Sequence, residues 1–534
     1  MSWMIALLGL WGCAGGKADT IITGAQVHLG DGALATAVAF EQGRVLALGE
    51  EALASEGRNT AVIDGQGLHA YPGFTDAHTH LLAGSFVLDR LLLTGVSSMD
   101  TILDRVASYA ELHPEEPWIV GYGWIAEAML DEPQGVLLDA IVSDRPVLLA
   151  NNSGHSALVN SYALQRAGIT ADTPDPPDGV IGRDPETGEL TGYLLEGALS
   201  LISEVAMSDY SNEQIASGLD DAMDDFIASG LTGISEIMAS PGFDISRPSI
   251  YQQREEAGEL GLRIHIYVPI FSPTDVLNAA TLRQEITGEL VTFGGGKIWV
   301  DGSMGTGEAW SLEAHVDDPE NFGSHYVDVT ALIEAISLAE QEGLSLKLHA
   351  NGDAAIEAAL DAFEVVAEER GGLDQQHVLE HVVLITEGDR LRLAGLGLVA
   401  SVQPVHVLPA GLGETADKWG ERFDDAYDYA SLAEAGVPLA FGTDWPVWPN
   451  SNPLLNLWSS QNMPQGHRVS RQQAIGAYTQ GSALSQGRSD ELGCLQVGCL
   501  ADAVLFDGEL AAVEIGDLMD IEVQQVWVAG RRVD

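Results

Sequence analysis

Hydrophobic and polar residues alternate with a period of two near both ends of the chain. The N-terminal runs of this kind cover residues 20–22, 25–29, 44–48 and 61–64, and the C-terminal runs cover 501–506 and 523–530. Because successive side chains of a strand point to opposite faces, this alternation predicts short, half-buried strands. We therefore predict a small β-sandwich domain built from residues 19–71 together with residues 490–534.

Between these ends, short apolar runs alternate with stretches of helical periodicity, such as 329–342 and 354–370. The strand-like runs cover residues 119–121, 146–150, 232–237, 262–270, 297–301, 346–349, 378–382, 398–403 and 438–442. Repeated strand–helix alternation favours an α/β fold with a parallel sheet, either open or closed into a barrel.

The amino-acid composition excludes or disfavours several classes of protein for this chain. With 46% hydrophobic residues in 534, the chain is not disordered. Its 79 acidic residues against 24 Lys and Arg give a net charge of −55, which disfavours a partner with a phosphate backbone. Only four of the basic residues are Lys, and such an acidic chain is typical of a high-salt environment. No apolar run approaches the roughly 20 residues of a membrane span.

Residues 4–11 form a short apolar run that ends before Gly12 and Cys13. This segment resembles a bacterial lipoprotein signal, so we expect residues 1–18 to be a signal and linker with a lipid anchor at Cys13. The protein would then be exported and held in the cell envelope, and a cytoplasmic protein is the alternative. The other two cysteines, Cys494 and Cys499, lie in a Gly-rich turn, where two free thiols are favoured over a disulfide.

His78 and His80 follow a strand-like run and lie two residues apart. Side chains at i and i+2 of a strand share a face, so both imidazoles can reach one metal ion. A structural histidine pair is the alternative. Four more candidates lie in or at the ends of predicted strands: Lys297, His349, His381 and Asp444.

The spacing of these candidates fits a barrel of about 31 residues per βα unit. His349 and His381 are 32 residues apart, or one unit, and His381 and Asp444 are 63 apart, or two units. His78 and Lys297 are 219 residues apart, which is far more than three units. The excess predicts an insertion around residues 111–200.

The segments that carry these residues resemble the amidohydrolase superfamily, and within it the branch of N-substituted formamide deformylase and the YtcJ-like proteins. The matching segments are 72–80, 297–305, 349–353, 401–404, 442–446 and 493–502. The resemblance covers nearly the whole chain after residue 18. It implies a TIM-type (β/α)₈ metallohydrolase barrel over residues 72–489.

The resemblance also implies roles for the six residues. His78 and His80 would hold a first divalent metal, and His349 and His381 a second. Asp444 would bind the first metal and act as general acid and base. Lys297 would carry a carbamate, formed with CO₂, that bridges the metals. Imidazole and carboxylate ligands suit two Zn²⁺ ions, with Fe, Mn or Co as alternatives.

The expected reaction is hydrolysis of an amide-like C–N bond in a small molecule, such as an N-acyl or N-formyl amine. A deaminase or cyclic amidase on the same fold, and a non-catalytic exported binding lipoprotein, are the alternatives, and a homo-oligomer is left open. Residues that could contact substrate or orient ligands are His155, Trp124, Glu196, Asp301 and Gln403, and His406 is a further histidine near a predicted strand end.

Overall fold

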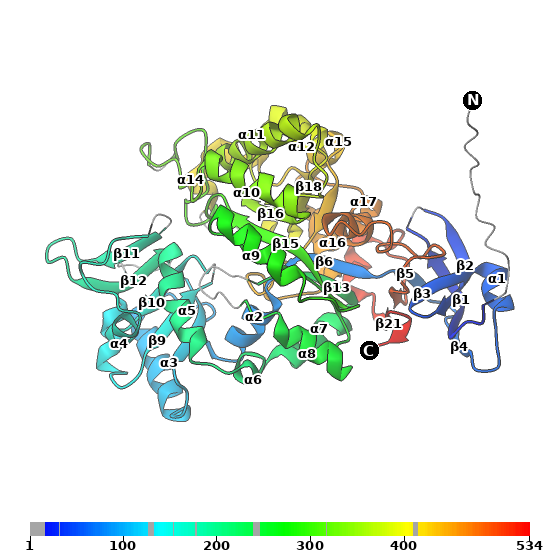
Figure 1. Ribbon diagram of the computed structural model, residues 1–534, viewed down its shortest axis with the longest axis horizontal. Coiled ribbons are helices and arrows are strands. Elements are labelled where there is room, and N and C mark those ends of the chain that lie inside the picture. Colours follow the sequence, from blue (N-terminus) through cyan, green and yellow to red (C-terminus); the bar gives the residue numbers. More distant parts are fainter. Residues whose placement is uncertain are drawn as a thin grey trace.

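The computed structural model describes residues 16–30, 32–125, 133–152, 154–176, 179–238, 246–316, 318–408 and 415–534. Three β-sheets organise these residues (Figure 1). A barrel with surrounding helices lies in the middle, one sheet formed by both chain ends lies on one side, and an inserted sheet lies on the other.

The central sheet has eight parallel strands, and its two edge strands meet at a bridge between Thr79 and Trp445. In chain order the strands are β6 (Phe74–Thr79), β13 (Leu231–Ile237), β14 (Arg263–Pro269), β15 (Val291–Trp299), β16 (Ser345–Ala350), β17 (Val378–His381), β18 (Val399–Val402) and β19 (Leu439–Phe441). Each strand pairs with the next one along the chain. The prediction of a TIM-type barrel is confirmed.

Helices connect and surround these strands. They are α2 (Leu81–Leu88), α5 (Ser200–Ser208), α6 (Asn212–Ile215), α7 (Leu219–Ala228), α8 (Ser249–Ala257), α9 (Pro273–Arg283), α10 (Val329–Glu342), α11 (Asp353–Arg370), α12 (Glu387–Gly395), α14 (Thr415–Trp419), α15 (Tyr429–Glu434), α16 (Pro453–Asn462), α17 (Arg471–Gly476) and α18 (Ser482–Ser485). The predicted helix 329–342 is confirmed at both ends. Asp328 accepts from the backbone N–H of Ala331 at its start, and Gly343 ends it with a φ of 68°.

Both chain ends enter one eight-stranded sheet of mixed direction. Its strands are β1 (Thr20–His28), β2 (Leu34–Glu41), β3 (Arg44–Leu48), β4 (Ala61–Asp64), β5 (His69–Pro72), β20 (Ala503–Phe506), β21 (Val523–Val528) and β22 (Arg531–Arg532), with α1 (Gly49–Ala54) after β3. The N- and C-terminal halves join where β5 pairs with β20. Strands from both chain ends thus share one sheet, while the composite β-sandwich domain of residues 19–71 and 490–534 stays a prediction.

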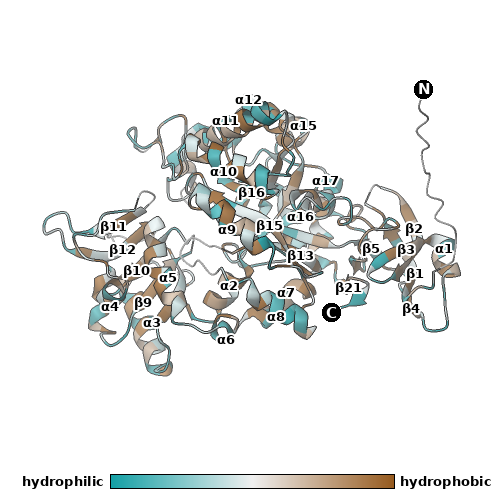
Figure 2. Ribbon diagram, viewed as in Figure 1, coloured by the Kyte–Doolittle hydropathy of each residue, from teal (hydrophilic) through white to brown (hydrophobic). Residues whose placement is uncertain are grey.

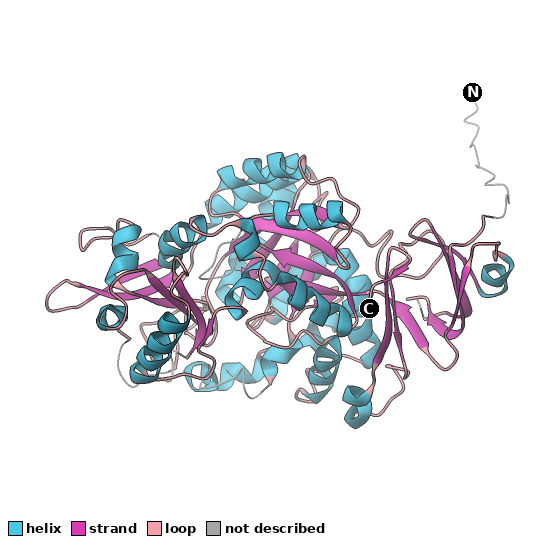
Figure 3. Cartoon of the chain, turned by 90° about the horizontal axis from the view of Figure 1, so that it is seen from below, coloured by secondary structure: helices cyan, strands magenta, loops and turns pink. Residues whose placement is uncertain are grey.

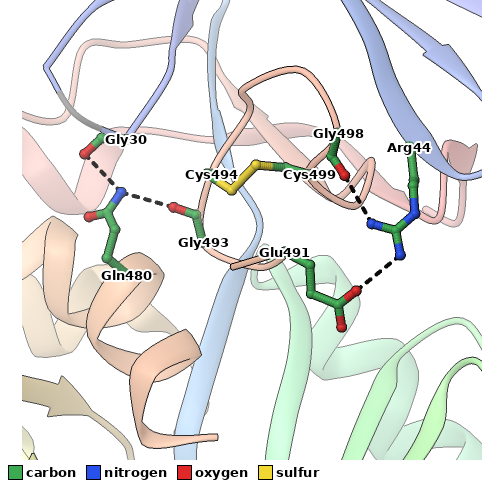
Figure 4. The surroundings of a disulfide bond; sticks show 8 residues. All are labelled: Gly30, Arg44, Gln480, Glu491, Gly493, Cys494, Gly498 and Cys499. Atoms are coloured by element: carbon green, nitrogen blue, oxygen red, sulfur yellow. Dashed lines mark hydrogen bonds and ion pairs between the residues drawn. A yellow bond between two sulfur atoms is a disulfide. The ribbon is translucent and has the colours of Figure 1, made fainter. Parts of the chain in front are cut away.

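The loop before β20 is closed by a disulfide between Cys494 and Cys499 (Figure 4). The expectation of two free thiols is wrong, because the turn brings the two Cα atoms within 6.1 Å. Arg44 of β3 donates to Gly498 O and Glu491 Oε2, and Gln480 donates to Gly30 O and Gly493 O. The loop thus connects the N-terminal strands with the helices that follow the barrel.

The inserted sheet is separate from the barrel (Figure 3). It contains β7 (Leu91–Leu92), β8 (Ile119–Trp124), β9 (Val147–Asn151), β10 (Ser156–Val159), β11 (Gly179–Arg183) and β12 (Leu190–Glu196), with α3 (Met99–Leu112) and α4 (Ser161–Arg166) packed nearby. The strand-like runs at 119–121 and 146–150 belong to this sheet. The chain enters this sheet after β6 and α2 and returns to the barrel at β13, so the insertion follows the strand that carries His78.

The main apolar core lies between the barrel strands and the surrounding helices. Surrounding helices such as α9 carry both brown and teal segments (Figure 2). A buried ion pair fastens the barrel to the terminal sheet: Arg263 of β14 donates to Asp502 at distances of 2.5 and 3.0 Å. Within the described ranges, no helix combines the length and apolar character that crossing a bilayer requires.

Candidate metal centre

All six predicted ligand residues lie at the carboxyl ends of barrel strands. His78 lies in β6, His80 directly follows it, and Asp444 comes three residues after β19. Lys297, His349 and His381 lie in β15, β16 and β17. Each of the six is at most 7% exposed. The carboxyl ends of the strands are where barrel enzymes build their active sites.

Three of these residues form a cluster that can hold a metal ion. His78, His381 and Asp444 each offer a ligand atom, and these atoms lie within 4.8 Å of one another. Asp444 Oδ1 is 3.3 Å from Nε2 of His78 and 3.1 Å from Nε2 of His80. Asp444 has a φ of +58°, and a Cβ atom on Gly442 would lie 2.7 Å from the backbone N of His78. A glycine at 442 is thus needed for Asp444 to come so close to β6.

The side chains of this cluster are in the protonation states that bind a metal cation. Burial lowers the pKa of His78 to about 4 and holds the pKa of His381 well below its usual value. Burial raises the pKa of Asp444, but its histidine neighbours outweigh this and keep that pKa well below the usual value. Neutral imidazoles beside an ionised carboxylate are the donor set that Zn²⁺ and related metals prefer. The residues present therefore fit a divalent metal.

The second predicted histidine pair lies beside the cluster. The ring centroids of His349 and His381 are 4.5 Å apart, and those of His381 and His78 are 5.0 Å apart. Nδ1 of His381 is 2.8 Å from Oε1 of Gln403, which fixes the orientation of the imidazole. Gln403 thus contacts a predicted ligand in this structure.

Lys297 is buried in β15, where it lies opposite Lys347 in the register with β16. Its Nζ atom lies 5.5 Å from the ring centroid of Trp299. Burial lowers the pKa of Lys297 to about 8, although the charges of Glu380 and Asp444 oppose this effect. A larger fraction of Lys297 than of an ordinary lysine is therefore a free amine near neutral pH, and the free amine is the form that can react with CO₂.

Asp301 organises the loop that follows β15. Its carboxylate accepts hydrogen bonds from the backbone N–H groups of Trp310, Asn351 and Gly352 at 2.8–2.9 Å. It also lies 3.7 Å from Nε2 of His349. Asp301 therefore fixes the loop against the end of β16, next to a predicted ligand.

The inserted sheet contributes a polar pair to the edge of the site. Nδ1 of His155 is 2.7 Å from Oε2 of Glu196, and the ring of His155 lies 6.3 Å from that of His349. Burial lowers the pKa of His155, but Glu196 outweighs it and the net shift is upward. Trp124 lies elsewhere, in the apolar core of the inserted sheet, with Nε1 donating to Leu149 O.

Sequence reasoning missed two buried charges beneath His78. Oε2 of Glu380 is 2.7 Å from Nδ1 of His78, and Oε1 of the same residue accepts from Nζ of Lys347 at 2.8 Å. Both residues are fully buried. One signal was available: Lys347 lies two residues before His349 and shares its face of β16.

Asp76 and His406 lie next to the residues of this cluster. Asp76 accepts from the backbone N–H and the hydroxyl of Thr443 and from the backbone N–H of His78, and burial raises its pKa to about 7. It thus ties the first barrel strand to the segment before Asp444. Nε2 of His406 lies 4.0 Å from Oδ2 of Asp444, which places this histidine at the site as well.

The sequence of this chain is similar to a family of known proteins along most of its length. The model of the amidohydrolase family matches residues 61–534. Protein LONG AFTER FAR-RED 3 of Arabidopsis thaliana is 30% identical over 515 residues, which cover 92% of this chain and 88% of that protein. The YtcJ protein of Bacillus subtilis (strain 168) is 30% identical over 491 residues, covering 89% and 90%. N-substituted formamide deformylase of Arthrobacter pascens is 27% identical over 542 residues, covering 96% and 97%.

Solved structures share the fold. An uncharacterized metal-dependent hydrolase from Pyrococcus horikoshii OT3 superposes with a TM-score of 0.74 at 23% identity, covering 93% of this chain and 99% of that one. A second, from Pyrococcus furiosus, gives 0.72 at 24% identity, covering 92% and 99%.

Proposed function

The chain belongs to the amidohydrolase family, as its motifs predicted, and from this premise we propose that it is a metal-dependent hydrolase that cleaves an amide-like C–N bond of a small molecule. The observation that carries the proposal is the cluster of His78, His381 and Asp444 at the mouth of the barrel. An N-acyl or N-formyl amine is the proposed class of substrate, in keeping with the relative that is named a formamide deformylase.

In this proposal His78, His80 and Asp444 hold one divalent metal, and His349 and His381 hold a second. The amine of Lys297 would form a bond to the carbon of CO₂, release a proton and become a carbamate, which would offer the metals a carboxylate-like ligand. Bound metal, probed first as zinc, would lower the pKa of water and polarise the substrate carbonyl.

Asp444 is the proposed general acid and base. Its carboxylate is ionised and lies at the centre of the cluster, so it can accept a proton from the attacking water. The water oxygen bonds to the carbonyl carbon, the C–N bond breaks, and the same proton passes from Asp444 to the departing amine nitrogen. His155, held by Glu196, is the proposed contact for the substrate on the side of the inserted sheet.

We also propose that the protein is exported and lipid-anchored in a bacterial envelope. The disulfide between Cys494 and Cys499 supports this proposal, because such bonds persist in oxidising compartments. Cys13, the proposed anchor, lies outside the described residues. Mass spectrometry of the protein from the membrane fraction, before and after lipase treatment, tests the anchor.

The decisive experiment is the metal content of the purified protein by elemental mass spectrometry, with native intact mass to detect a carboxylated Lys297. Two metals per chain, a carbamate and turnover of N-formyl or N-acyl amines support the proposal. One metal and an unmodified Lys297 would instead favour a deaminase. No metal after incubation with zinc and bicarbonate would contradict the proposal and favour a binding protein.

A further inference from the structure

His78 has a carboxylate at each of its two ring nitrogens. Oε2 of Glu380 lies 2.7 Å from Nδ1, and Oδ1 of Asp444 lies 3.3 Å from Nε2. A neutral imidazole carries its proton on one nitrogen and a lone pair on the other. The two atoms are close but are not aligned as a hydrogen bond, so it is the negative charge beside Nδ1 that favours the tautomer with the proton there, which leaves the lone pair of Nε2 facing the cluster.

Glu380 is itself held by Lys347. The Nζ atom of this fully buried lysine donates to Oε1 of Glu380 at 2.8 Å and to the carbonyl oxygen of Ala77 at 2.9 Å. It also lies 4.9 Å from the ring centroid of Tyr267. Each polar contact of Lys347 thus leads to His78, one through the carboxylate and one through the residue that precedes His78 in β6.

The position of Lys347 in the barrel adds to this argument. Its strand, β16, stands four places from β6 in the order of the eight strands, which is the opposite side of the barrel. The side chain of Lys347 therefore reaches from β16 across the barrel interior to the carbonyl oxygen of Ala77 in β6. Glu380 thus contacts the ring of His78 directly, and Lys347 holds Glu380 in place.

We propose that Glu380 and Lys347 are a positioning pair that fixes the tautomer and the ring orientation of His78 for metal binding. The inference rests on the proposed metal centre, and neither residue contacts the reacting atoms. Stability alone does not require such a pair, because a buried ion pair can often be replaced by apolar side chains without loss of stability. The geometry around His78 supplies the reason for keeping the charges.

The test compares Glu380→Gln, Lys347→Met and the double variant with the wild-type chain. Each protein is stripped of metal and reloaded with zinc, and the zinc it retains against a competing chelator is measured by elemental mass spectrometry. The unfolding midpoint of each metal-free protein is measured in parallel. Zinc retention reports on the positioning role, and the midpoint reports on folding.

Glu380→Gln is informative because it alters charge with little change in shape. Its carbonyl oxygen can still accept from Lys347, but its NH₂ group then faces Nδ1 of His78 and favours the opposite tautomer. We expect zinc affinity to fall about 10- to 100-fold, the usual effect of losing such a partner. In Glu380→Gln/Lys347→Met both members of the pair are neutral, so the midpoint should recover toward wild type while zinc affinity stays low.

Glu340 supplies a matched control. Its Oε1 atom lies 3.0 Å from Nε2 of His377, which is also fully buried. His377 lies just before the start of β17, whereas His381 is the last residue of that strand. Glu340→Gln should lower the midpoint and leave zinc affinity unchanged. Should Glu380→Gln fail to fold, Glu380→Asp retains the charge but withdraws it from Nδ1, and it should also bind zinc more weakly.

Zinc affinity of the double variant equal to that of the wild type would overturn the inference, because folding would then be the only role of the pair. An equal loss of zinc in Glu340→Gln would overturn it as well, because the effect would not be specific to His78. A wild-type chain that takes up no zinc would overturn the proposed function itself. The two failures are therefore distinguishable.

Discussion

The Nε2 atom of His80, just after the first strand of the barrel, lies 3.1 Å from Oδ1 of Asp444, just after the last. The two residues meet because the barrel closes at the bridge between Thr79 and Trp445. This closure gives Asp444 contact with both histidines of the pair. Loss of the Asp444 carboxylate should therefore affect binding and chemistry together.

Asp444→Asn should reduce kcat for C–N bond hydrolysis by about 10²- to 10⁴-fold, the usual contribution of a general acid–base group. It should also lower the zinc content, because an amide is a weaker ligand. The measurement is steady-state kinetics on an N-formyl or N-acyl amine that the wild type hydrolyses. Asp220→Asn, on an exposed side chain, is the control. Full activity in Asp444→Asn would contradict its assigned role.

The His155–Glu196 pair should matter for substrate and not for metal. A hydrogen bond to a charged group contributes about 1.5–3 kcal/mol, and each 1.36 kcal/mol corresponds to a tenfold change in rate. We expect His155→Gln and Glu196→Gln each to lower kcat/KM about 10- to 100-fold with unchanged zinc content. Zinc loss in either variant would show that the pair supports the metal ligands instead.

The pair of Glu340 and His377 predicts a pH dependence of stability. Burial raises the pKa of Glu340, but hydrogen bonds from His377 and two backbone N–H groups outweigh it and hold the pKa at about 2, below its ordinary 4.5. A carboxyl whose pKa is depressed by folding stabilises the protein above its unfolded pKa, and the contribution is lost as the pH falls.

Glu340→Gln should therefore lower the free energy of unfolding by about 1.5–3 kcal/mol at pH 7. The difference between variant and wild type should shrink as the pH falls from about 4.5 toward 2, the range between the two pKa values. Urea unfolding of both proteins at several pH values measures it. A difference that stays constant down to pH 2 would refute the assignment.

The barrel and the placement of the candidate ligands at its strand ends were predictable, because strand ends recur at a regular spacing. His349 and His381 are 32 residues apart, and their strands are neighbours in the sheet. Glu380 escaped prediction for a local reason. Alternation along a strand places residues 380 and 381 on opposite faces, but His381 and Val382 have φ values of +73° and +46°. The backbone turns there, and both side chains reach the interior.

Other features depend on long-range packing that no local pattern records. The sequence can place Lys347 on the face of His349, but its partners Glu380 and Ala77 come from β17 and β6 and cannot be read from that pattern. The first strand of the inserted sheet, β7, has only two residues and precedes the predicted insertion. The pairing of Cys494 with Cys499 depends on the path of a turn that contains Gly493 and Gly498, both with positive φ.

The disulfide between Cys494 and Cys499 should stabilise the folded chain. A closed loop this short is expected to contribute about 2 kcal/mol through the entropy of the unfolded state. Cys494→Ser/Cys499→Ser should therefore unfold at a lower urea concentration than the wild type under non-reducing conditions. With a reductant present the two proteins should behave alike. A wild-type midpoint that does not respond to the reductant would contradict the prediction.

The excess of acidic residues should make stability depend on salt. A net charge of −55 on one chain creates mutual repulsion, and the Debye length falls from about 10 Å at 0.1 M salt to about 3 Å at 1 M. Screening should thus raise the thermal unfolding midpoint by several degrees between about 0.05 and 1 M NaCl. Sodium sulfate at matched ionic strength separates screening from the exclusion of salt from the surface, since only the second effect is stronger for sulfate. A midpoint that is highest at low salt would mean that repulsion between the carboxylates does not limit the stability of this fold.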